Sequence, residues 1–252
     1  MSKHEKFILT PITSVIEEMK AATLCIGKGI ETYPLWDYII QSTFTKMTGF
    51  QEQKMRCIDW ELATNGYDYR LNFIEDVKNR GTYSTYEAKN KVYNALINEI
   101  ARYSGIGKKD LITELKGSKI IKPRESIQQI LEGTNIIYCK ERDFNEFKKC
   151  DKEFNNQFFV IPDSNTSKSV KLFETVLVTH YMEELYRQRN RIAHNTLSYQ
   201  QNLPDLEMLK GESSLSRNYF FWFSILFLID EIFIELFKIY SKCLKDNSYF
   251  ND

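Results

Sequence analysis

A chain of 252 residues with 42% hydrophobic and 14% aromatic residues can bury a substantial core, which excludes an intrinsically disordered protein. Its 34 lysine and arginine residues are matched by 34 aspartate and glutamate residues, so a protein that coats nucleic acid by bulk charge attraction is also excluded. The five cysteines are scattered without any C-x-x-C pair, and this spacing indicates free thiols in a reducing cytoplasm rather than a zinc site or a disulfide framework.

The first half of the chain predicts a series of amphipathic helices, and its few glycines and prolines favour long ones. Residues 11–30 predict a first helix, and residues 33–66 a longer one with a bend at Gly49. Residues 84–103 predict a third helix, because a polar cap is followed by apolar residues at a helical spacing. The tryptophans fall in apolar helical patterns and are expected in the core: Trp36, Trp60 and Trp222.

The middle of the chain, from 105 to about 165, is less regular and holds several glycines and prolines. Short helices are expected there over 109–116 and 124–133, and a short strand over 157–162. We interpret this region as an insertion on the helical core of a single domain that spans 1–252.

Two more long helices are expected to close the chain, over about 167–194 and about 216–245, joined by a polar linker of residues 197–215. The last helix has apolar residues on more than one face, among them Phe220, Phe221, Phe223, Ile225, Phe227, Leu228, Ile232, Leu236 and Ile239. So wide an apolar surface predicts burial by the bundle on one side and by a partner subunit on the other. The pattern as a whole predicts an all-α fold, an antiparallel helical bundle with an irregular middle insertion.

The most apolar stretch, residues 219–237, carries Asp230, Glu231 and Glu235 and so lacks the unbroken apolar run of a membrane span. The N-terminal residues also lack the layout of a signal peptide. We therefore expect a cytoplasmic protein that does not enter a membrane. Adjacent carboxylates such as Asp230 and Glu231 are expected in salt bridges or on solvated faces, because no histidine pattern accompanies them to form a metal site.

The segment RQRNRIAHN, residues 187–195, concentrates polar chemistry near the end of a predicted helix. Arginines at a helix C-terminus interact favourably with the helix dipole, and a single histidine is most often a surface or core side chain. However, Asn190 and Arg191 lie three and four residues after Arg187, and His194 lies four and three residues after them, which places all four along one stripe of a helix. Such a stripe combines guanidinium groups suited to phosphate with an imidazole that can transfer protons near neutral pH.

The hexapeptide R-N-R-I-A-H, located between two long C-terminal helices of an all-α chain, resembles the signature of HEPN domains. In this sequence Arg189, Asn190, Ala193 and His194 occupy the positions of that motif. HEPN domains are small helical domains of prokaryotic toxin–antitoxin, abortive-infection and CRISPR-associated systems. The resemblance implies a metal-independent endoribonuclease of a toxin or anti-phage defence system, formed by a homodimer whose two motifs face each other.

The resemblance also implies roles for individual residues. Arg189, Asn190 and His194 would be catalytic, without metal or another cofactor. RNA-binding roles are expected for Arg187, Arg191 and Tyr199. Glu52, in the stretch GFQEQKMR, resembles an acidic residue that often lines the same pocket in the family. Besides RNA, the expected partners are a second copy of the chain and a separate antitoxin or regulatory protein.

The geometry of the motif leaves alternatives open. Arg189 and His194 are five residues apart, so on a straight helix they point about 140° from each other. Either the helix bends or ends between them, or each reaches the site from a different protomer of a symmetric dimer. Arg191 competes with Arg189 for the catalytic role, because it lies on the same helix face as His194. A non-catalytic helical dimer that binds nucleotide, RNA or a partner protein is the alternative function.

Overall fold

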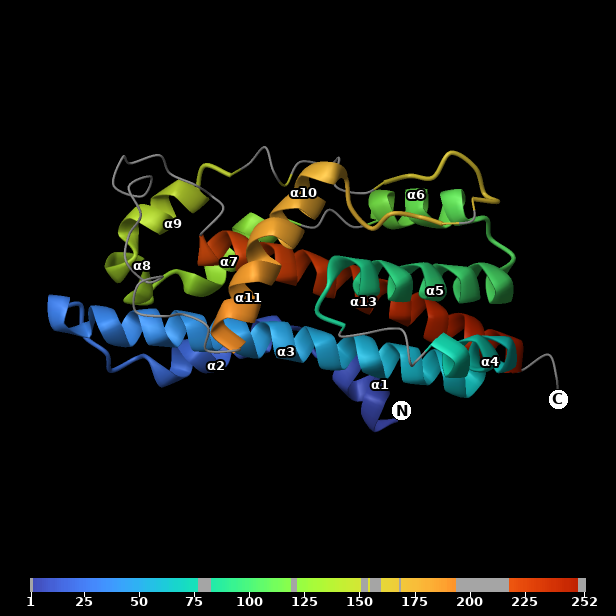
Figure 1. The fold of residues 1–252 in the computed structure, drawn as a ribbon, viewed down its shortest axis with the longest axis horizontal. Helices are drawn as coiled ribbons and strands as arrows, with labels where there is room; N and C mark the ends of the chain where they lie inside the picture. Colours follow the sequence, from blue (N-terminus) through green and yellow to red (C-terminus); the bar gives the residue numbers. More distant parts are fainter. Residues whose placement is uncertain are drawn as a thin grey trace.

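The computed structural model shows an all-helical bundle, as the sequence predicts (Figure 1). It describes residues 2–76, 83–118, 122–150, 154, 160–167, 169–193 and 218–248. No β-strand occurs in these ranges, and residues 160–162 of the expected strand are irregular, while 157–159 lie outside the described residues. The expected linker of residues 197–215 also lies outside them. None of the described helices is both long and apolar enough to cross a membrane.

The helices follow one another with short connections. In chain order the described elements are α1 (Lys3–Ile8), α2 (Thr13–Ala22), the 3-10 turn η1 (Ile30–Thr32), α3 (Tyr33–Asn65), α4 (Tyr67–Asp76), α5 (Tyr86–Ser104), α6 (Lys108–Ser118), α7 (Pro123–Leu131), α8 (Ile136–Cys139), α9 (Glu141–Phe147), α10 (Thr175–Thr179), the π-helical segment η2 (His180–Leu185), α11 (Tyr186–Ala193) and α13 (Tyr219–Ser248).

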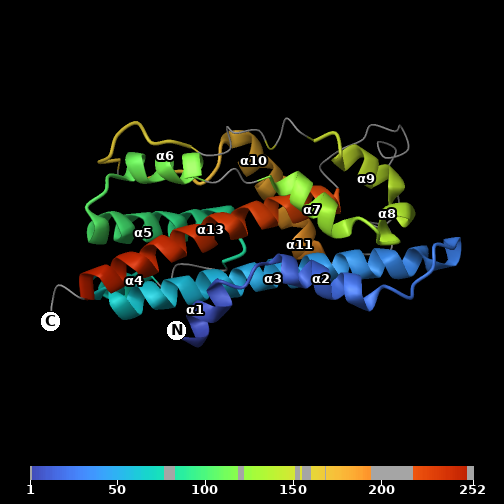
Figure 2. The ribbon, with the colours of Figure 1, turned by 180° about the vertical axis from the view of Figure 1, so that it is seen from behind.

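Two long helices, α3 and α13, organise the bundle, and the other elements pack around them (Figures 1 and 2). α3 has 33 residues and continues through Gly49 without interruption, which at 1.5 Å per residue gives a rod of about 50 Å. α5 and α7 pack against α13, and α1 and α2 pack against α3. The unit α10–η2–α11 crosses the bundle obliquely and contacts both α3 and α13. This crossing determines where the arginine-rich segment meets the core.

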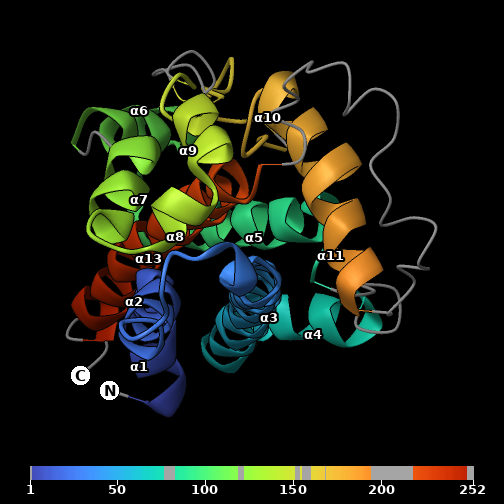
Figure 3. The same cartoon turned by 90° about the vertical axis from the view of Figure 1, so that its left-hand side faces the viewer.

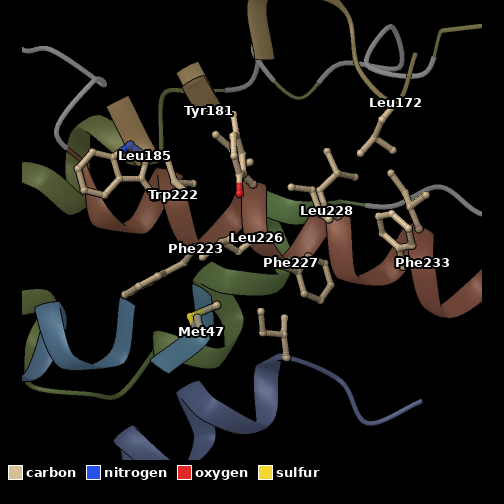
Figure 4. Close-up of a cluster of buried hydrophobic side chains, with 14 of the residues drawn as sticks. Met47, Leu172, Tyr181, Leu185, Trp222, Phe223, Leu226, Phe227, Leu228 and Phe233 are labelled. Atoms are coloured by element: carbon tan, nitrogen blue, oxygen red, sulfur yellow. The ribbon is translucent and has the colours of Figure 1, made fainter. Parts of the chain in front are cut away.

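Residues 220–230, the first part of α13, are all buried within one chain. Figure 4 shows Trp222, Phe223, Leu226, Phe227, Leu228 and Phe233 projecting from α13 in different directions, with Tyr181 and Leu185 above the helix and Met47 below it. In the view along the bundle axis, α13 passes between α5 and α7, and its C-terminal end lies at the outer edge of the bundle (Figure 3). Even Phe227, with 9% of its surface exposed, is buried. The wide apolar surface is therefore covered inside the bundle, and it gives no reason to expect a partner subunit on this helix.

Residues 105–165 are more helical than the sequence pattern predicts. The expected short helices are α6 and α7, whereas α8 and α9 were not predicted. α9 lies in a strongly charged stretch, but Phe144 and Phe147 are three residues apart and both are buried in the common core. An apolar pair at this spacing is enough to anchor one helical turn, and the surrounding charges conceal it in the sequence.

The helix expected from about residue 167 begins only at Thr175. Before it, the backbone of 170–173 lies along α5 and bonds to side chains of that helix. Val170 donates its backbone N–H to Asn94 Oδ1 at 2.6 Å and accepts from Asn94 Nδ2 at the same distance, while Leu172 N–H donates to Asn90 Oδ1 at 2.8 Å. These side chains satisfy backbone groups that a helix would otherwise pair, so an irregular segment is stable here.

One expected core residue is on the surface. Trp36 and Trp222 are buried as predicted, whereas Trp60 on α3 is 58% exposed and packs edge-on against the His4 ring. α3 is covered by other elements along only part of its circumference, so an apolar residue on its outer face remains in contact with solvent.

A buried ion pair joins three separate parts of the chain. Lys54 on α3 and Asp230 on α13 are both 0% exposed, and Lys54 Nζ lies 2.5 Å from Asp230 Oδ1. Lys54 Nζ also donates to the Thr10 carbonyl oxygen at 2.7 Å, and the Ile12 N–H donates to Asp230 Oδ2 at 2.8 Å. Asp230 therefore forms a salt bridge, as expected from the sequence, and it fixes the connection between α1 and α2 against both long helices.

We expect Asp230→Leu to lower the free energy of unfolding by about 3–5 kcal/mol, because Lys54 would remain buried without its counter-charge. The double variant Lys54→Met/Asp230→Leu should lose less free energy of unfolding than Asp230→Leu alone, since no uncompensated charge remains in the core. Urea denaturation monitored by circular dichroism measures both. Lys238→Met breaks an exposed pair with Glu235 on the same helix and should change stability by less than about 1 kcal/mol. A double variant less stable than Asp230→Leu would contradict this interpretation.

Candidate functional site

The structure describes the arginine-rich segment up to Ala193. Arg187, Arg189, Asn190 and Arg191 lie on α11, whereas His194 and Tyr199 lie outside the described residues. The chain is helical through Ala193, so the helix does not end between Arg189 and that residue.

Arg189 is held by a carboxylate from a distant part of the sequence. Its Nη2 lies 2.6 Å from Oε1 of Glu52 on α3, a residue 137 positions earlier, and the two side chains are 19% and 12% exposed. Its Nη1 donates to Asn190 Oδ1 at 3.0 Å. A guanidinium group has five N–H donors, so these two contacts orient the group and leave donors for a ligand. The structure thus brings together three of the residues that the sequence singles out.

The π-helical segment η2 helps to aim Arg189 at α3. Leu177, Tyr181 and Leu185 are buried at successive spacings of four, and Arg189 continues the series. On a regular α-helix each spacing of four rotates the side chain by about 40°, and three of them would turn Arg189 well away from the core. A π-helical turn contains more residues and opposes this drift. Arg189 therefore becomes the polar end of a buried stripe.

The other arginines of the segment lie differently. Arg187 and Arg191 are exposed, whereas Arg189 and Asn190 are half-buried. Gln188 donates from Nε2 to the Tyr219 hydroxyl at 2.9 Å, which ties α11 to the start of α13. Of the two arginines that compete for the catalytic role, Arg189 is the one that pairs with Glu52.

A lysine that sequence reasoning did not single out lies behind this ion pair. Lys89 on α5 is 1% exposed and donates from Nζ to the Tyr83 carbonyl oxygen at 2.8 Å. Glu52, Lys89 and Arg189 line one small hollow, about 170 Å³ of space between atoms and too narrow for a water molecule, together with Ser84 and Tyr181.

Hydrogen bonds hold the backbone acceptor of Lys89 in place. The Tyr83 hydroxyl donates to Oδ2 of Asp59 on α3 at 2.8 Å, and the Tyr69 hydroxyl donates to Oδ1 of the same carboxylate at 2.7 Å. The Tyr181 hydroxyl donates to the Ser84 carbonyl oxygen at 2.8 Å. The segment before α5 is therefore fixed to both α3 and η2, and with it the position of Lys89.

The surroundings of Lys89 change its acidity. Burial lowers the pKa of Lys89 to about 7, the nearby Glu52 opposes this shift, and Arg189 reinforces it. Burial raises the pKa of Tyr181 well above its usual value, so this phenol stays neutral. Lys89 is thus a group of the described site that titrates near neutral pH.

The sequence did contain a signal for Lys89. It precedes Val92 by three residues and Leu96 by seven, and both are core positions of the predicted third helix. A lysine on the apolar face of an amphipathic helix indicates a buried charge with a specific partner, because long charged side chains are rarely buried otherwise. The partner cannot be read from the helical pattern, since it comes from α3 and α11.

Comparisons of the chain with protein-family models, with curated proteins and with solved structures give no match. The resemblance of residues 189–194 to the HEPN signature therefore stays a prediction. The described site itself contains an oriented guanidinium, a carboxylate and a titratable ammonium, a set suited to binding an anionic ligand.

The lowered pKa of Lys89 gives a test of its burial. An exposed lysine in the unfolded chain has a pKa of about 10.4, so between about pH 7 and pH 10 the unfolded chain binds more protons than the folded one. The folded state is then stabilised as the pH rises through this window. The quantity to measure is the unfolding free energy of the unmodified protein minus that of Lys89→Met. This difference should increase by up to about 1.4 kcal/mol for each pH unit in the window. Urea denaturation at several pH values measures this, and parallel profiles for the two proteins would contradict it.

Proposed function

We propose that the protein is a metal-independent endoribonuclease of a toxin or anti-phage defence system, with a composite active site at a homodimer interface. The observation that supports it most directly is the pairing of Arg189 with Glu52. It fixes the arginine of the motif in a half-buried position, five residues before a histidine. The resemblance to HEPN domains implies an acidic residue near the motif, and Glu52 is the candidate that the sequence offers for it.

The proposed reaction uses the ribose 2′-OH as an internal nucleophile. The 2′-oxygen attacks the adjacent phosphorus while a base removes its proton, and the P–O5′ bond breaks as an acid protonates the leaving 5′-oxygen. The products are a 2′,3′-cyclic phosphate and a 5′-hydroxyl. DNA lacks the 2′-OH and would not be cut. Histidine suits both proton transfers because its reference pKa is about 6.5.

Each group has a role in this scheme. His194 from the two subunits would divide the acid and base roles, and Arg189 would stabilise the negative charge on the phosphorane. Electrostatic stabilisation of this kind is most effective when the donors are already oriented, and the contacts of Arg189 with Glu52 and Asn190 provide that orientation. The exposed Arg187 and Arg191, with Tyr199, would contact the RNA backbone.

A symmetric dimer would remove the difficulty posed by the spacing of the motif. α11 is helical at least to Ala193, and a continuation of this helix by one residue would point the next side chain about 140° away from Arg189. Two copies of the same segment facing each other across a two-fold axis would pair the arginine of one protomer with the histidine of the other.

His194→Ala tests the proposal. General acid–base catalysis contributes about 10²–10⁴-fold, so the variant should lose RNA cleavage on that scale while its circular dichroism spectrum is unchanged. The assay incubates purified protein with total RNA and with single-stranded DNA, and identifies the cyclic phosphate ends by mass spectrometry. His180→Ala is the matched control, because that ring packs against Phe221 and should not affect the rate strongly. Salt-dependent RNA binding without any cleavage by the unmodified protein would favour a non-catalytic binding module instead.

Arg189→Ala and Arg191→Ala distinguish the two candidate arginines. Removal of an oriented donor to a transition-state oxyanion costs about 10²–10³-fold in rate, so Arg189→Ala should lose that much. Arg191→Ala removes an exposed charge and should lose less than about tenfold. Single-turnover cleavage of a short RNA measures both, and the reverse order would assign the catalytic role to Arg191.

A further inference from the structure

Arg189 and Glu52 form an ion pair whose charges cancel, which is an unfavourable arrangement for a site that must attract phosphate. The carboxylate lies 2.6 Å from the guanidinium, so any phosphate that approaches Arg189 also approaches a negative charge. The two side chains are largely withdrawn from solvent, where such repulsion is only weakly screened. A third charge is needed if this site is to remain positive.

Lys89 is positioned to supply that charge. It lines the same hollow as Glu52 and Arg189 and is almost completely buried. In the described part of the chain its ammonium has one hydrogen-bond partner, the Tyr83 carbonyl oxygen at 2.8 Å, although the group carries three donors. Its positive charge interacts with the Glu52 carboxylate through space across this hollow, without a direct hydrogen bond.

We propose that Lys89 is the counter-charge of Glu52, and that it leaves the positive charge of Arg189 available to a phosphodiester. Lys89 is then a positioning residue that acts through Glu52 and does not touch the RNA. This inference rests on the proposed function, because it takes an RNA phosphate as the ligand of Arg189. With Lys89 protonated, the site has a net charge of +1; without it, the site is neutral.

The acidity of Lys89 makes this charge dependent on pH. The charged and titratable groups that line the hollow with it are Glu52 from α3, Arg189 and Tyr186 from α11, and Tyr181 from η2. Burial keeps Tyr181 neutral, because it raises the pKa of this phenol. Burial lowers the pKa of Lys89 to about 7. The lysine therefore loses its charge as the pH rises through neutrality, and affinity for phosphate should fall with it.

Binding of a 2′-O-methyl RNA oligonucleotide, which cannot be cleaved because its 2′-oxygen is blocked, tests the proposal by fluorescence anisotropy. At about pH 6.5 we expect Lys89→Met to bind about tenfold more weakly than the unmodified protein. The double variant Lys89→Met/Glu52→Gln restores the net charge of +1 and should recover most of that affinity. A packing defect at Lys89 would not be rescued by a change at Glu52.

Two further proteins complete the experiment. Lys91→Met removes one positive charge from an exposed position on the same helix and should weaken binding less than about threefold. Lys89→Arg keeps the charge at every pH, so its affinity should not show the decrease that the unmodified protein shows between about pH 6.5 and pH 8.5. All other titratable groups are common to both proteins, so the difference between their pH profiles isolates Lys89. Lys89→Arg also provides the test should Lys89→Met not fold.

The outcomes separate this inference from the proposed function. Rescue by Glu52→Gln without cleavage of unmodified RNA would support the role of Lys89 and overturn the ribonuclease. RNA cleavage together with binding that is insensitive to Lys89→Met would support the ribonuclease and overturn the role of Lys89. Equal losses of RNA affinity in Lys89→Met and in Lys89→Met/Glu52→Gln would also overturn the role of Lys89.

Discussion

A single helix, α3, carries the two charge pairs that position the rest of the molecule. On α3, Glu52 pairs with Arg189 of α11, and two residues further along the helix Lys54 pairs with Asp230 of α13. Residues two apart point to nearly opposite sides of a helix, so α3 is tied through these neighbours to both later elements. The obliquely crossing unit that carries the arginine-rich segment is fixed by the first pair, and the bundle core by the second.

These pairs specify geometry more than they add stability. The free energy needed to withdraw two charges from water nearly offsets their attraction, so an intact buried pair adds little stability. Removal of one partner is strongly destabilising, because the other charge stays buried without compensation. Apolar packing around α13 provides the main driving force for folding. The consequence for function is that Arg189, Glu52 and Lys89 occupy fixed relative positions in a low-dielectric environment, where each charge strongly affects the others.

Much of the fold followed from apolar spacing. The long helix 33–66, the helix near 84–103 and the last helix are found as α3, α5 and α13, because their periodic apolar residues face one continuous core. The position at which α10 begins could not be predicted from apolar spacing. The side chains of Asn90 and Asn94 on α5 form hydrogen bonds with the backbone of the preceding segment, which is therefore not helical. The π-helical segment could not be predicted either. It keeps one row of side chains facing the core, and which row must face the core depends on the elements that the helix packs against.

The sequence by itself determined the helical class of this protein, the extent of its longest helices and the arginine-rich segment, since these depend on composition and on contacts between residues three or four apart. Only the tertiary structure decided that Glu52 meets Arg189, that the apolar surface of α13 is covered within one chain, and that Lys89 lies behind the ion pair. The physical reason is that charge pairing in a core depends on which helix faces come together. That arrangement is set by the packing of α3, α5 and α11, elements far apart along the chain.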